Sequence, residues 1–399
     1  MIKSLRGMKE ILPPQNKKYE HFIEVASSIA KKYGFEFIET PILEETALYI
    51  RSVGDSSDIV GKEMYSFIDK GKNDVSLRPE GTAGVVRSFI QQKYDKAGQV
   101  KRFFYYGPMF RYERPQKGRF RQFHQFGCES FGEDSYIEDI NIILMMGDIF
   151  DKLNIEYTIK LNSLGCDECT PPYRKKLVKF LDTNIEEICD DCKTRRDTNP
   201  IRTLDCKNPN CQSLYVNAPK ITTNLCQNCD SDFEKIKKIL NSMNIKYEVD
   251  SNLVRGLDYY NKSAFEFISE GLAIAGGGRY DKLTSMLGGK DTPAIGFAIG
   301  IERIIELIEI PEDKKDGYYI GTMCEDLDEL LLTLAHKKRK ENKVHLNVNP
   351  KSLKATLKSA DKLGFKYCVF IGEDEVKDNK IWIKDLQEKT ELLINQKDF

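Results

Sequence analysis

Residues 100–132 contain two strand-like segments joined by a short basic loop, and this stretch limits the fold more than any other part of the chain. The sequence reads VKRFFYYGPMFRYE, then RPQKGR, then FRQFHQFGCESFG. Aromatic residues recur along both outer segments, as is typical of β-strands. The stretch predicts two strands that run out and back around a charged loop.

The predicted strands carry polar side chains that could bind a nucleotide. Arg111 and Glu113 alternate along the first strand, so we expect them to share one face, and the returning strand carries Phe123, Gln125 and Glu129. Arginine suits bidentate phosphate binding, a carboxylate can accept from an exocyclic amine, and an aromatic ring can stack on a base. A salt-bridged hairpin with a solvated loop remains an alternative for this stretch alone.

The chain of 399 residues is too long for one ordinary domain. Apolar spacing predicts a helix over residues 17–33 that ends at Gly34, then a strand to Pro41. Mixed strands and helices continue to residue 161, a cysteine-rich insertion spans about 162–245, and the pattern resumes up to a helix starting near Thr292. With a linker at 310–317, we expect a large domain over 1–316 and a small α/β domain over 317–399.

Composition excludes several classes of protein. The 61 Lys+Arg and 62 Asp+Glu residues nearly cancel, so the net charge gives no indication of a nucleic-acid partner. No run of about 18 apolar residues is present, which excludes a membrane-spanning helix, and the first residues do not read as a signal peptide. We therefore expect a cytoplasmic protein whose eleven cysteines are reduced.

Three segments resemble, in order, the motifs of the class II aminoacyl-tRNA synthetases. The helix and strand ending at Pro41 resemble motif 1, the dimer-forming element. Arg-x-Glu, a basic loop and Arg-x-x-x-Phe resemble motif 2, and GFAIGIER (296–303) resembles motif 3, in which a helix presents an arginine to the γ-phosphate. The resemblance implies an α/β (α+β) fold with an antiparallel sheet flanked by helices, and a homodimer.

Two further segments narrow the resemblance. LRPEGT (77–82) and LVRGLDYYN (253–261) are similar to the segments that mark histidyl-tRNA synthetases. Histidine needs an anion for its ammonium group and polar groups at both edges of its imidazole, which the resemblance assigns to Glu129 and Tyr260. The full histidine-binding set that it implies is Glu80, Gly81, Thr82, Arg111, Gln125, Glu129, Arg255, Tyr259 and Tyr260.

The implied reaction needs no protein nucleophile. The carboxylate of histidine attacks the α-phosphate of ATP and expels pyrophosphate, and tRNA(His) then receives the histidyl group on its 3′-terminal adenosine. Positioning and cations dominate such chemistry. By resemblance, the catalytic residues are Arg111, Arg255 and Gln125. The ATP-binding residues would be Arg111, Glu113, Arg119, Phe123 and Arg303, with Mg²⁺ entering as part of the ATP substrate.

Alternatives remain open at this point. One is the synthetase-like regulatory subunit of ATP phosphoribosyltransferase, a binding protein of histidine biosynthesis that generally lacks the C-terminal domain. Another is a synthetase for threonine or proline, which would lack the Glu129 and Tyr260 pair. The segment AGGGRYD (275–281) lacks the spacing of a phosphate-binding loop. By resemblance, Arg279 and Tyr280 support the histidine pocket instead, while Glu10 departs from the residue that the family usually has.

The C-terminal segment KSLKATLKSADKLGFK has lysines three or four residues apart, which places them along one face of a helix. They are Lys351, Lys354, Lys358, Lys362 and Lys366, with Leu353, Leu357, Ala360 and Leu363 expected on the other side. A solvated face is one interpretation. The resemblance implies an anticodon-binding domain here, somewhat short at its C-terminus, and hence a tRNA contact.

Eight of the eleven cysteines form four close pairs between residues 166 and 229. Thiolates two to four residues apart match the ligand spacing of structural zinc sites, and eight could fill two Cys₄ tetrahedra. One alternative is that they are buried small hydrophobic residues, and another is that the pairs descend from a metal-binding ancestor and no longer hold a metal. The pairs are Cys166 and Cys169, Cys189 and Cys192, Cys206 and Cys211, and Cys226 and Cys229. We expect the metal to stabilise the insertion, and adenylation to proceed without it.

Overall fold

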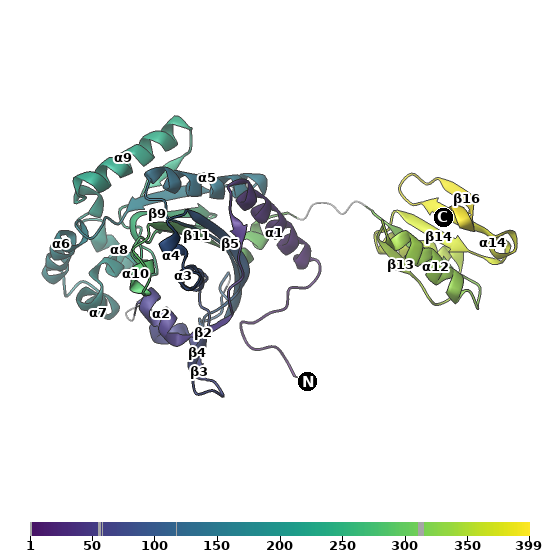
Figure 1. Cartoon of the computed structure of the whole chain (residues 1–399), viewed down its shortest axis with the longest axis horizontal. Helices are drawn as coiled ribbons and strands as arrows, with labels where there is room; N and C mark the ends of the chain where they lie inside the picture. The colour runs from purple at the N-terminus through teal and green to yellow at the C-terminus, as the bar shows by residue number, and fades with distance from the viewer. Residues whose placement is uncertain (1, 55–56, 58, 117, 310–314) are drawn as a thin grey trace. The chain divides into compact units, whose positions relative to one another are not determined.

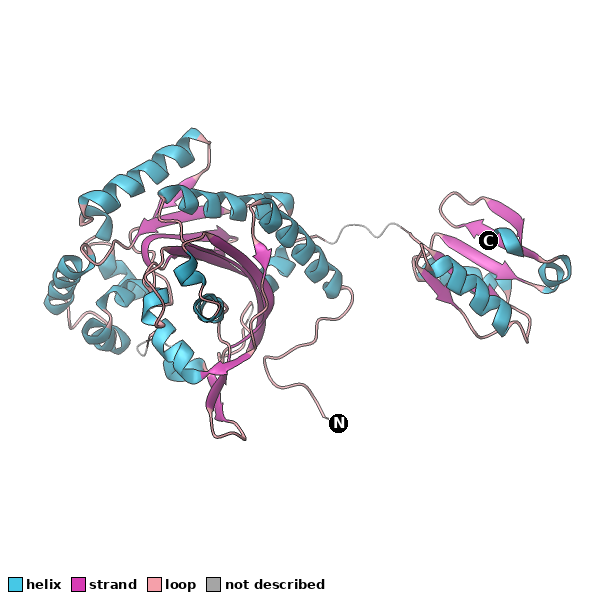
Figure 2. Ribbon diagram, viewed as in Figure 1, coloured by secondary structure: helices cyan, strands magenta, loops and turns pink. Residues whose placement is uncertain are grey.

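The computed structural model describes residues 2–54, 57, 59–116, 118–309 and 315–399. The chain divides into two compact units, Met1–Glu309 and Ile310–Phe399, which are drawn in Figures 1 and 2. Of the linker expected at 310–317, residues 310–314 lie outside the described part. Among the described helices, none is long and apolar enough to cross a membrane.

The larger unit is built on an eight-stranded sheet in the order β1-β5-β6-β11-β10-β9-β7-β8. Neighbouring strands are antiparallel except at the two edges, where β1 pairs with β5 and β7 with β8 in parallel. The strands are β1 (Glu36–Phe37), β5 (Lys101–Phe110), β6 (Gln122–Phe131), β7 (Thr158–Ser163), β8 (Tyr247–Val249), β9 (Asn261–Ser269), β10 (Leu272–Arg279) and β11 (Ala294–Gly300). The predicted antiparallel sheet flanked by helices is confirmed.

Helices cover the two faces of this sheet unequally (Figures 1 and 2). The main core lies against α1 (Gln15–Lys32), α5 (Tyr136–Lys152), α9 (Gln227–Ser242) and α11 (Ile301–Leu307). The other face packs on α3 (Thr82–Gln91), next to α4 (Tyr94–Ala97), through a smaller core with Val85 and Phe89. Near α3 lie α2 (Thr46–Val53), α10 (Leu283–Met286), a helical turn η1 (Ile59–Glu63) and a small sheet of β2 (Leu43–Glu45), β4 (Asp74–Leu77) and β3 (Tyr65–Ile68).

Side-chain alternation along β6 separates the hydrophobic core from the polar face. Phe126 and Cys128 are fully buried in the main core, whereas Phe123 and Gln125 line a cavity on the opposite face. The two strands predicted around the basic loop are β5 and β6, which pair over their whole length from Lys101 with Phe131 to Phe110 with Gln122. The hairpin therefore forms one wall of that cavity.

Two local predictions had different outcomes. The N-terminal helix is α1, and Gly34 follows its end with a positive φ of 80°, a conformation that glycine adopts without strain. The helix predicted to start near Thr292 was wrong, because residues 294–300 form β11 and the helix starts only at Ile301. β11 pairs with both β6 and β10, and this tertiary pairing decided its conformation.

The cysteine-rich insertion is helical and lies between β7 and β8. It contains α6 (Thr170–Thr183), α7 (Asp190–Thr198), η2 (Pro200–Asp205), α8 (Pro209–Tyr215), η3 (Ile221–Thr223) and α9. A small core of its own includes Tyr173, Leu177, Leu181 and Tyr215, together with four of the cysteines. The insertion therefore has an apolar cluster that is separate from the two cores on the sheet.

The smaller unit is a five-stranded sheet in the order β13-β12-β14-β15-β16, with α12 packed on one face and α13 on the other. On α13, Lys354, Lys358 and Lys362 are exposed and Ala360 is buried, but Leu353 and Leu363 are exposed, against expectation. The elements are β12 (Tyr318–Thr322), α12 (Asp328–Arg339), β13 (Val344–Leu346), α13 (Leu353–Lys362), β14 (Tyr367–Ile371), α14 (Glu373–Asp378), β15 (Lys380–Asp385), β16 (Glu391–Asn395) and η4 (Gln396–Asp398).

Candidate active site

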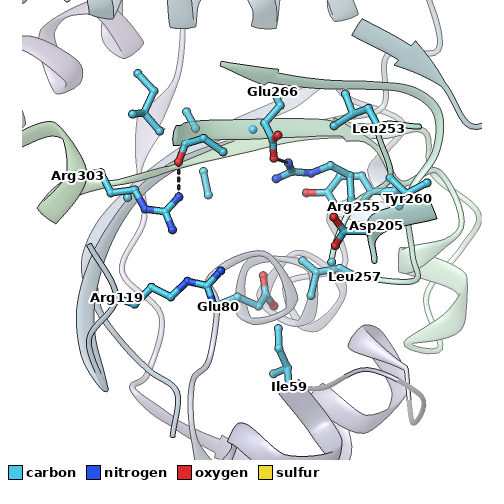
Figure 3. A pocket seen from close by; sticks show the side chains of 18 of the residues that line it. Ile59, Glu80, Arg119, Asp205, Leu253, Arg255, Leu257, Tyr260, Glu266 and Arg303 are labelled. Atoms are coloured by element: carbon cyan, nitrogen blue, oxygen red, sulfur yellow. Dashed lines mark hydrogen bonds and ion pairs between the residues drawn. The ribbon is translucent and has the colours of Figure 1, made fainter. Parts of the chain in front are cut away.

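A cavity of about 690 Å³ lies on the face of the large sheet opposite its main core, and Figure 3 shows it from close by. Arg255 and Arg303 enter this cavity from opposite sides, and Arg119 and Glu80 lie below them in the view. Eleven of the predicted site residues line it: Glu80, Thr82, Arg111, Glu113, Arg119, Phe123, Gln125, Arg255, Tyr259, Tyr260 and Arg303. Gly81 and Glu129 are behind this lining.

Three arginines of the cavity are held by backbone or carboxylate oxygens. Nε of Arg111 donates to the carbonyl of Pro79 at 2.8 Å, and its guanidinium lies 5.3 Å from the centre of the Phe123 ring. Nη1 of Arg255 lies 2.6 Å from a carboxylate oxygen of Glu266 on β9. Arg303 donates to the carbonyl of Ala273. Each guanidinium is thus held in position before any ligand binds, and its remaining nitrogen atoms can donate to an anion.

Burial and nearby cations shape the electrostatics at the Arg303 end. Burial lowers the pKa of Arg303, and the positive charge of Arg119 acts in the same direction. Arg119 pairs with Glu113 across 3.3 Å and is half exposed. Arg111 and Glu113 were both expected on the first strand, but β5 ends at Phe110, and both residues lie in the loop that follows. Two cations this close favour a polyanionic ligand between them.

Glu80 caps the helix that faces the sheet. Its two carboxylate oxygens accept from the backbone N–H groups of Thr82 at 2.7 Å and Ala83 at 2.8 Å, at the start of α3. Only 3% of Glu80 is exposed, and burial raises its pKa although these hydrogen bonds oppose the shift. A carboxylate at this helix terminus is favoured by the helix dipole, and it fixes LRPEGT against the cavity.

Glu129 is almost fully buried, 1% exposed, beneath the cavity. The hydroxyls of Thr82 (2.8 Å), Tyr105 (3.1 Å) and Tyr280 donate to its carboxylate. Burial raises its pKa to about 8, although these three hydroxyls oppose the shift. Gly296 on β11 lies against this carboxyl group and leaves no room for a Cβ atom there, so the glycine makes the burial of Glu129 possible.

Several buried polar atoms of residues that line the cavity have no hydrogen-bond partner among the described residues. Two of them are Oε1 of Gln125 and Nε of Arg255. Unpaired buried polar atoms are costly and therefore uncommon. Both residues line the cavity, so these atoms are suited to bind a polar ligand.

Several lining residues were missed from the sequence. Glu266 faces the cavity from β9 and binds Arg255, and Tyr105 reaches Glu129 from β5. Alternation along a predicted strand was the only available signal for either. The insertion also contributes lining residues, namely Leu204, Asp205, Lys207, Gln212 and Tyr215. The insertion therefore borders the cavity directly, and the expectation that adenylation proceeds without the metal stays a prediction.

The eight cysteines of the insertion meet as two separate quartets. Cys166 and Cys169 join Cys226 and Cys229, while Cys189 and Cys192 join Cys206 and Cys211. In each quartet all sulfur atoms lie within 4.8 Å of one another. All eleven cysteines of the chain are free thiols. The sequence predicted two Cys₄ sets but not which pairs combine.

Fold and cavity together define a class of protein. An antiparallel sheet carries one arginine from a hairpin and another from the helix after β11, on the face that α3 packs against. This is the arrangement of the class II aminoacyl-tRNA synthetases, as the three motifs implied.

Comparisons with known proteins narrow the class. Residues 7–304 match the family described as "Histidyl-tRNA synthetase", and residues 313–399 match "Anticodon binding domain". "Histidine--tRNA ligase" of Sulfurimonas denitrificans is 60% identical over 398 residues, 99% of each chain. The apo crystal structure of S. aureus histidyl-tRNA synthetase is 33% identical with a TM-score of 0.83, covering 100% of this chain and 98% of that one. The chain belongs to the histidyl-tRNA synthetase family.

A further likeness bears on the regulatory-subunit alternative. A Bacillus halodurans C structure described as an "ATP phosphoribosyltransferase regulatory subunit/histidyl-tRNA synthetase" has a TM-score of 0.66 and covers 93% of this chain and 98% of that one. Its identity to this chain is 19%, so it shows the shared fold alone.

The buried Glu129 predicts a pH dependence of stability. In the folded protein this carboxyl stays protonated up to about pH 8, whereas in the unfolded chain it ionises above pH 4.5. Its contribution to stability is therefore fully present below pH 4.5 and is lost as the pH rises through 8. Glu129→Gln cannot ionise, so its free energy of unfolding should fall less between pH 5 and pH 8. Urea unfolding at both pH values checks this, and an identical fall in both proteins contradicts it.

Proposed function

We propose that this chain is a histidine–tRNA ligase, which activates L-histidine with ATP and transfers it to tRNA(His). The observation that carries the proposal is the single cavity in which eleven residues implied by the motifs meet. The 60% identical relative bears the same activity in its name, over almost the whole of both chains. The regulatory-subunit alternative has only a likeness at 19% identity in its favour.

Histidine is held, in this proposal, at the α3 end of the cavity. Glu80 and the unpaired Oε1 of Gln125 offer acceptors for the ammonium group. Tyr260 borders the cavity directly and Glu129 lies behind Thr82. The family resemblance supports the assignment of these two residues to opposite edges of the imidazole. Gly81 leaves space for the Tyr105 ring that supports Glu129. A side chain without ring nitrogens would leave these buried polar groups unpaired.

ATP occupies the arginine-lined part. Glu113 and Phe123 would hold adenine, Arg119 and Arg303 the γ-phosphate, and Arg111 the α-phosphate, with Mg²⁺ as part of the substrate. Arg255, fixed by Glu266, would stabilise the reacting carboxylate and α-phosphate. The histidine carboxylate forms a bond to phosphorus as the bond to pyrophosphate breaks. No proton has to move in this step, so preorganised cations do the catalytic work.

We also propose tRNA(His) and a second copy of this chain as partners. Exposed lysines on α13 offer contacts to phosphates in the domain that matches "Anticodon binding domain". Phe37, Leu43, Phe67 and Ile68 of the β1, β2 and β3 strands are exposed, and a dimer contact in the motif 1 region would cover them. Reduced thiols in the insertion suit the cytoplasm as the working compartment.

Each cysteine quartet is proposed to hold one structural zinc ion. A tetrahedron with Zn–S bonds of about 2.3 Å has sulfur–sulfur edges of about 3.8 Å. The distances are 3.7 Å between Cys166 and Cys169, and 3.8 Å between Cys166 and Cys226. In the second quartet, Cys189 and Cys206 are 3.7 Å apart. The residues present fit the metal by this test, and a bound zinc ion would cross-link helices that share only a small core.

The first prediction concerns substrate. Purified protein should exchange labelled pyrophosphate into ATP with histidine and not with the other nineteen amino acids, because only histidine pairs all the buried polar groups. It should also charge tRNA bearing the histidine anticodon. Equal exchange with threonine or proline contradicts the proposal, as does a lack of exchange with every amino acid.

The second prediction concerns Arg255. Arg255→Ala should slow adenylation by about 100- to 1000-fold, by analogy with the loss of one oxyanion-hole donor, while the Kd values for ATP and histidine change little. Arg255→Lys keeps the charge without the planar fork and should recover part of the rate. Single-turnover measurements separate the chemical step from binding. An unchanged rate in the folded Arg255→Ala protein rules out the assignment.

The third prediction concerns α13. Replacing Lys354, Lys358 and Lys362 with glutamate should weaken tRNA charging most at low salt. The deficit relative to wild type should shrink as salt rises, because the variant has lost phosphate contacts that depend on counterion release. Pyrophosphate exchange with histidine should stay at the wild-type rate. A matched control is the same triple change at Lys377, Lys384 and Lys389, which lie elsewhere in the same unit. Equal charging by all three proteins would make the α13 lysines a solvated surface only.

The fourth prediction concerns zinc. Protein purified without chelator should contain two zinc ions per chain by mass spectrometry of the metal. Cys229→Ser or Cys211→Ser, one from each quartet, should lower the count to one, whereas Cys324→Ser, outside both quartets, should leave it at two. Absence of zinc, with eight thiols of the insertion freely titratable in the folded protein, contradicts the proposal.

A further inference from the structure

The segment that carries Arg255, Tyr259 and Tyr260 has no regular structure of its own. Residues 253–260 lie between β8 and β9 and belong to neither a helix nor a strand. Such a segment has no backbone ladder to hold it, so contacts from other elements must fix its position. One of these contacts is the ion pair between Arg255 and Glu266 on β9.

The segment also contacts α2 and β7, where the N–H of Asp258 donates to the carbonyl of Val53 and Asn162 donates to the carbonyl of Leu253. A further set of contacts comes from the cysteine-rich insertion. Nη1 of Arg202 donates to the carbonyl of Gly256 at 2.8 Å and lies 3.5 Å from a carboxylate oxygen of Asp258. Nδ2 of Asn199 donates to the same carboxylate oxygen at 2.9 Å. The side chains of Arg202 and Asp258 are 13% and 20% exposed, so solvent screens this ion pair only in part. Val254 packs into the core of the insertion.

Arg202 lies on η2, which is itself anchored by the second cysteine quartet. Cys192 lies before this element and Cys206 directly after it, and both sulfur atoms belong to the same quartet. Between them, Leu204 is buried in the core of the insertion and also borders the cavity. The position of Arg202 therefore depends on whether the four cysteines of this quartet are held together.

We propose that Arg202 and Asn199 are positioning residues for adenylation. By holding Gly256 and Asp258, they fix the backbone on both sides of Leu257, and with it the guanidinium of Arg255 and the paired tyrosines. The insertion thereby acts as a brace for the catalytic segment, in addition to any contact with tRNA. This inference rests on the proposed ligase function.

Steady-state pyrophosphate exchange with histidine, on full-length protein with its metal content measured, tests the brace. Arg202→Ala should lower kcat by on the order of 10- to 100-fold, because a small displacement of a catalytic group far from the change has this effect. KM for ATP and for histidine should change less than about threefold, since the other binding residues are untouched. Arg202→Lys should restore part of kcat.

Arg196→Ala is the matched control. Arg196 lies in the same insertion but pairs with Asp182 and Asp197, which belong to the insertion as well. Its kcat should stay within about twofold of wild type. Asp258→Asn tests the same contact from the other side, and it applies even where Arg202→Ala fails to fold. Combined with Arg202→Ala, it should cost little more than either change alone.

The outcomes separate the brace from the ligase function. A wild-type protein that is active with histidine, next to fully active Arg202→Ala and Asp258→Asn proteins, overturns the brace and leaves the function intact. Equal losses in Arg202→Ala and Arg196→Ala, together with loss of zinc from both, also overturn it, because they indicate general damage to the insertion. A wild-type protein that is inert with every amino acid overturns the ligase function instead.

Discussion

The alternation of side chains across the large sheet is the constraint on which the rest of the structure depends. Along β6, each residue that faces α1 and α5 is followed by one that faces the opposite side, so a single strand supplies Phe126 to the core and Gln125 to the cavity. A slip of one residue in the pairing with β5 would exchange the two sets. The observed register, with Tyr105 opposite Gly127, keeps Glu129 under the cavity.

A sheet face with so many charged groups needs glycine at the points of closest approach. Gly276 on β10 leaves room for the guanidinium of Arg255, and Gly296 on β11 leaves room for the carboxyl group of Glu129. Any Cβ at either place would displace a buried polar group that has few alternative positions. The glycines in AGGGRYD and GFAIGIER therefore serve close packing against side chains, and a phosphate-binding loop is not needed to explain them.

The sequence was informative where chemistry is carried by local motifs and uninformative where it depends on distant contacts. The hairpin around Arg111, the helix before Gly34 and the two Cys₄ sets could be predicted from spacing. The helix expected near Thr292 was wrong, because pairing with two neighbouring strands outweighed local preference. The site roles of Glu129 and Arg303 came from resemblance. Contacts such as that of Arg202 with Asp258 join residues far apart in sequence, which no local pattern records.

The insertion is a small element that borders the cavity and also contacts the segment that bears Arg255. Its core is too small to be rigid by burial alone, and two quartets of thiols at the ends of its helices would supply the missing cross-links. The first quartet begins beside the pairing of Gly165 with Lys262, directly after Asn261, and the second encloses the element that bears Arg202. The irregular segment thus meets the insertion at Val254, Gly256 and Asp258, and β9 meets it just after the segment ends. Because the segment has no regular structure to fix its backbone, the rigidity of the insertion determines how precisely the guanidinium of Arg255 is oriented.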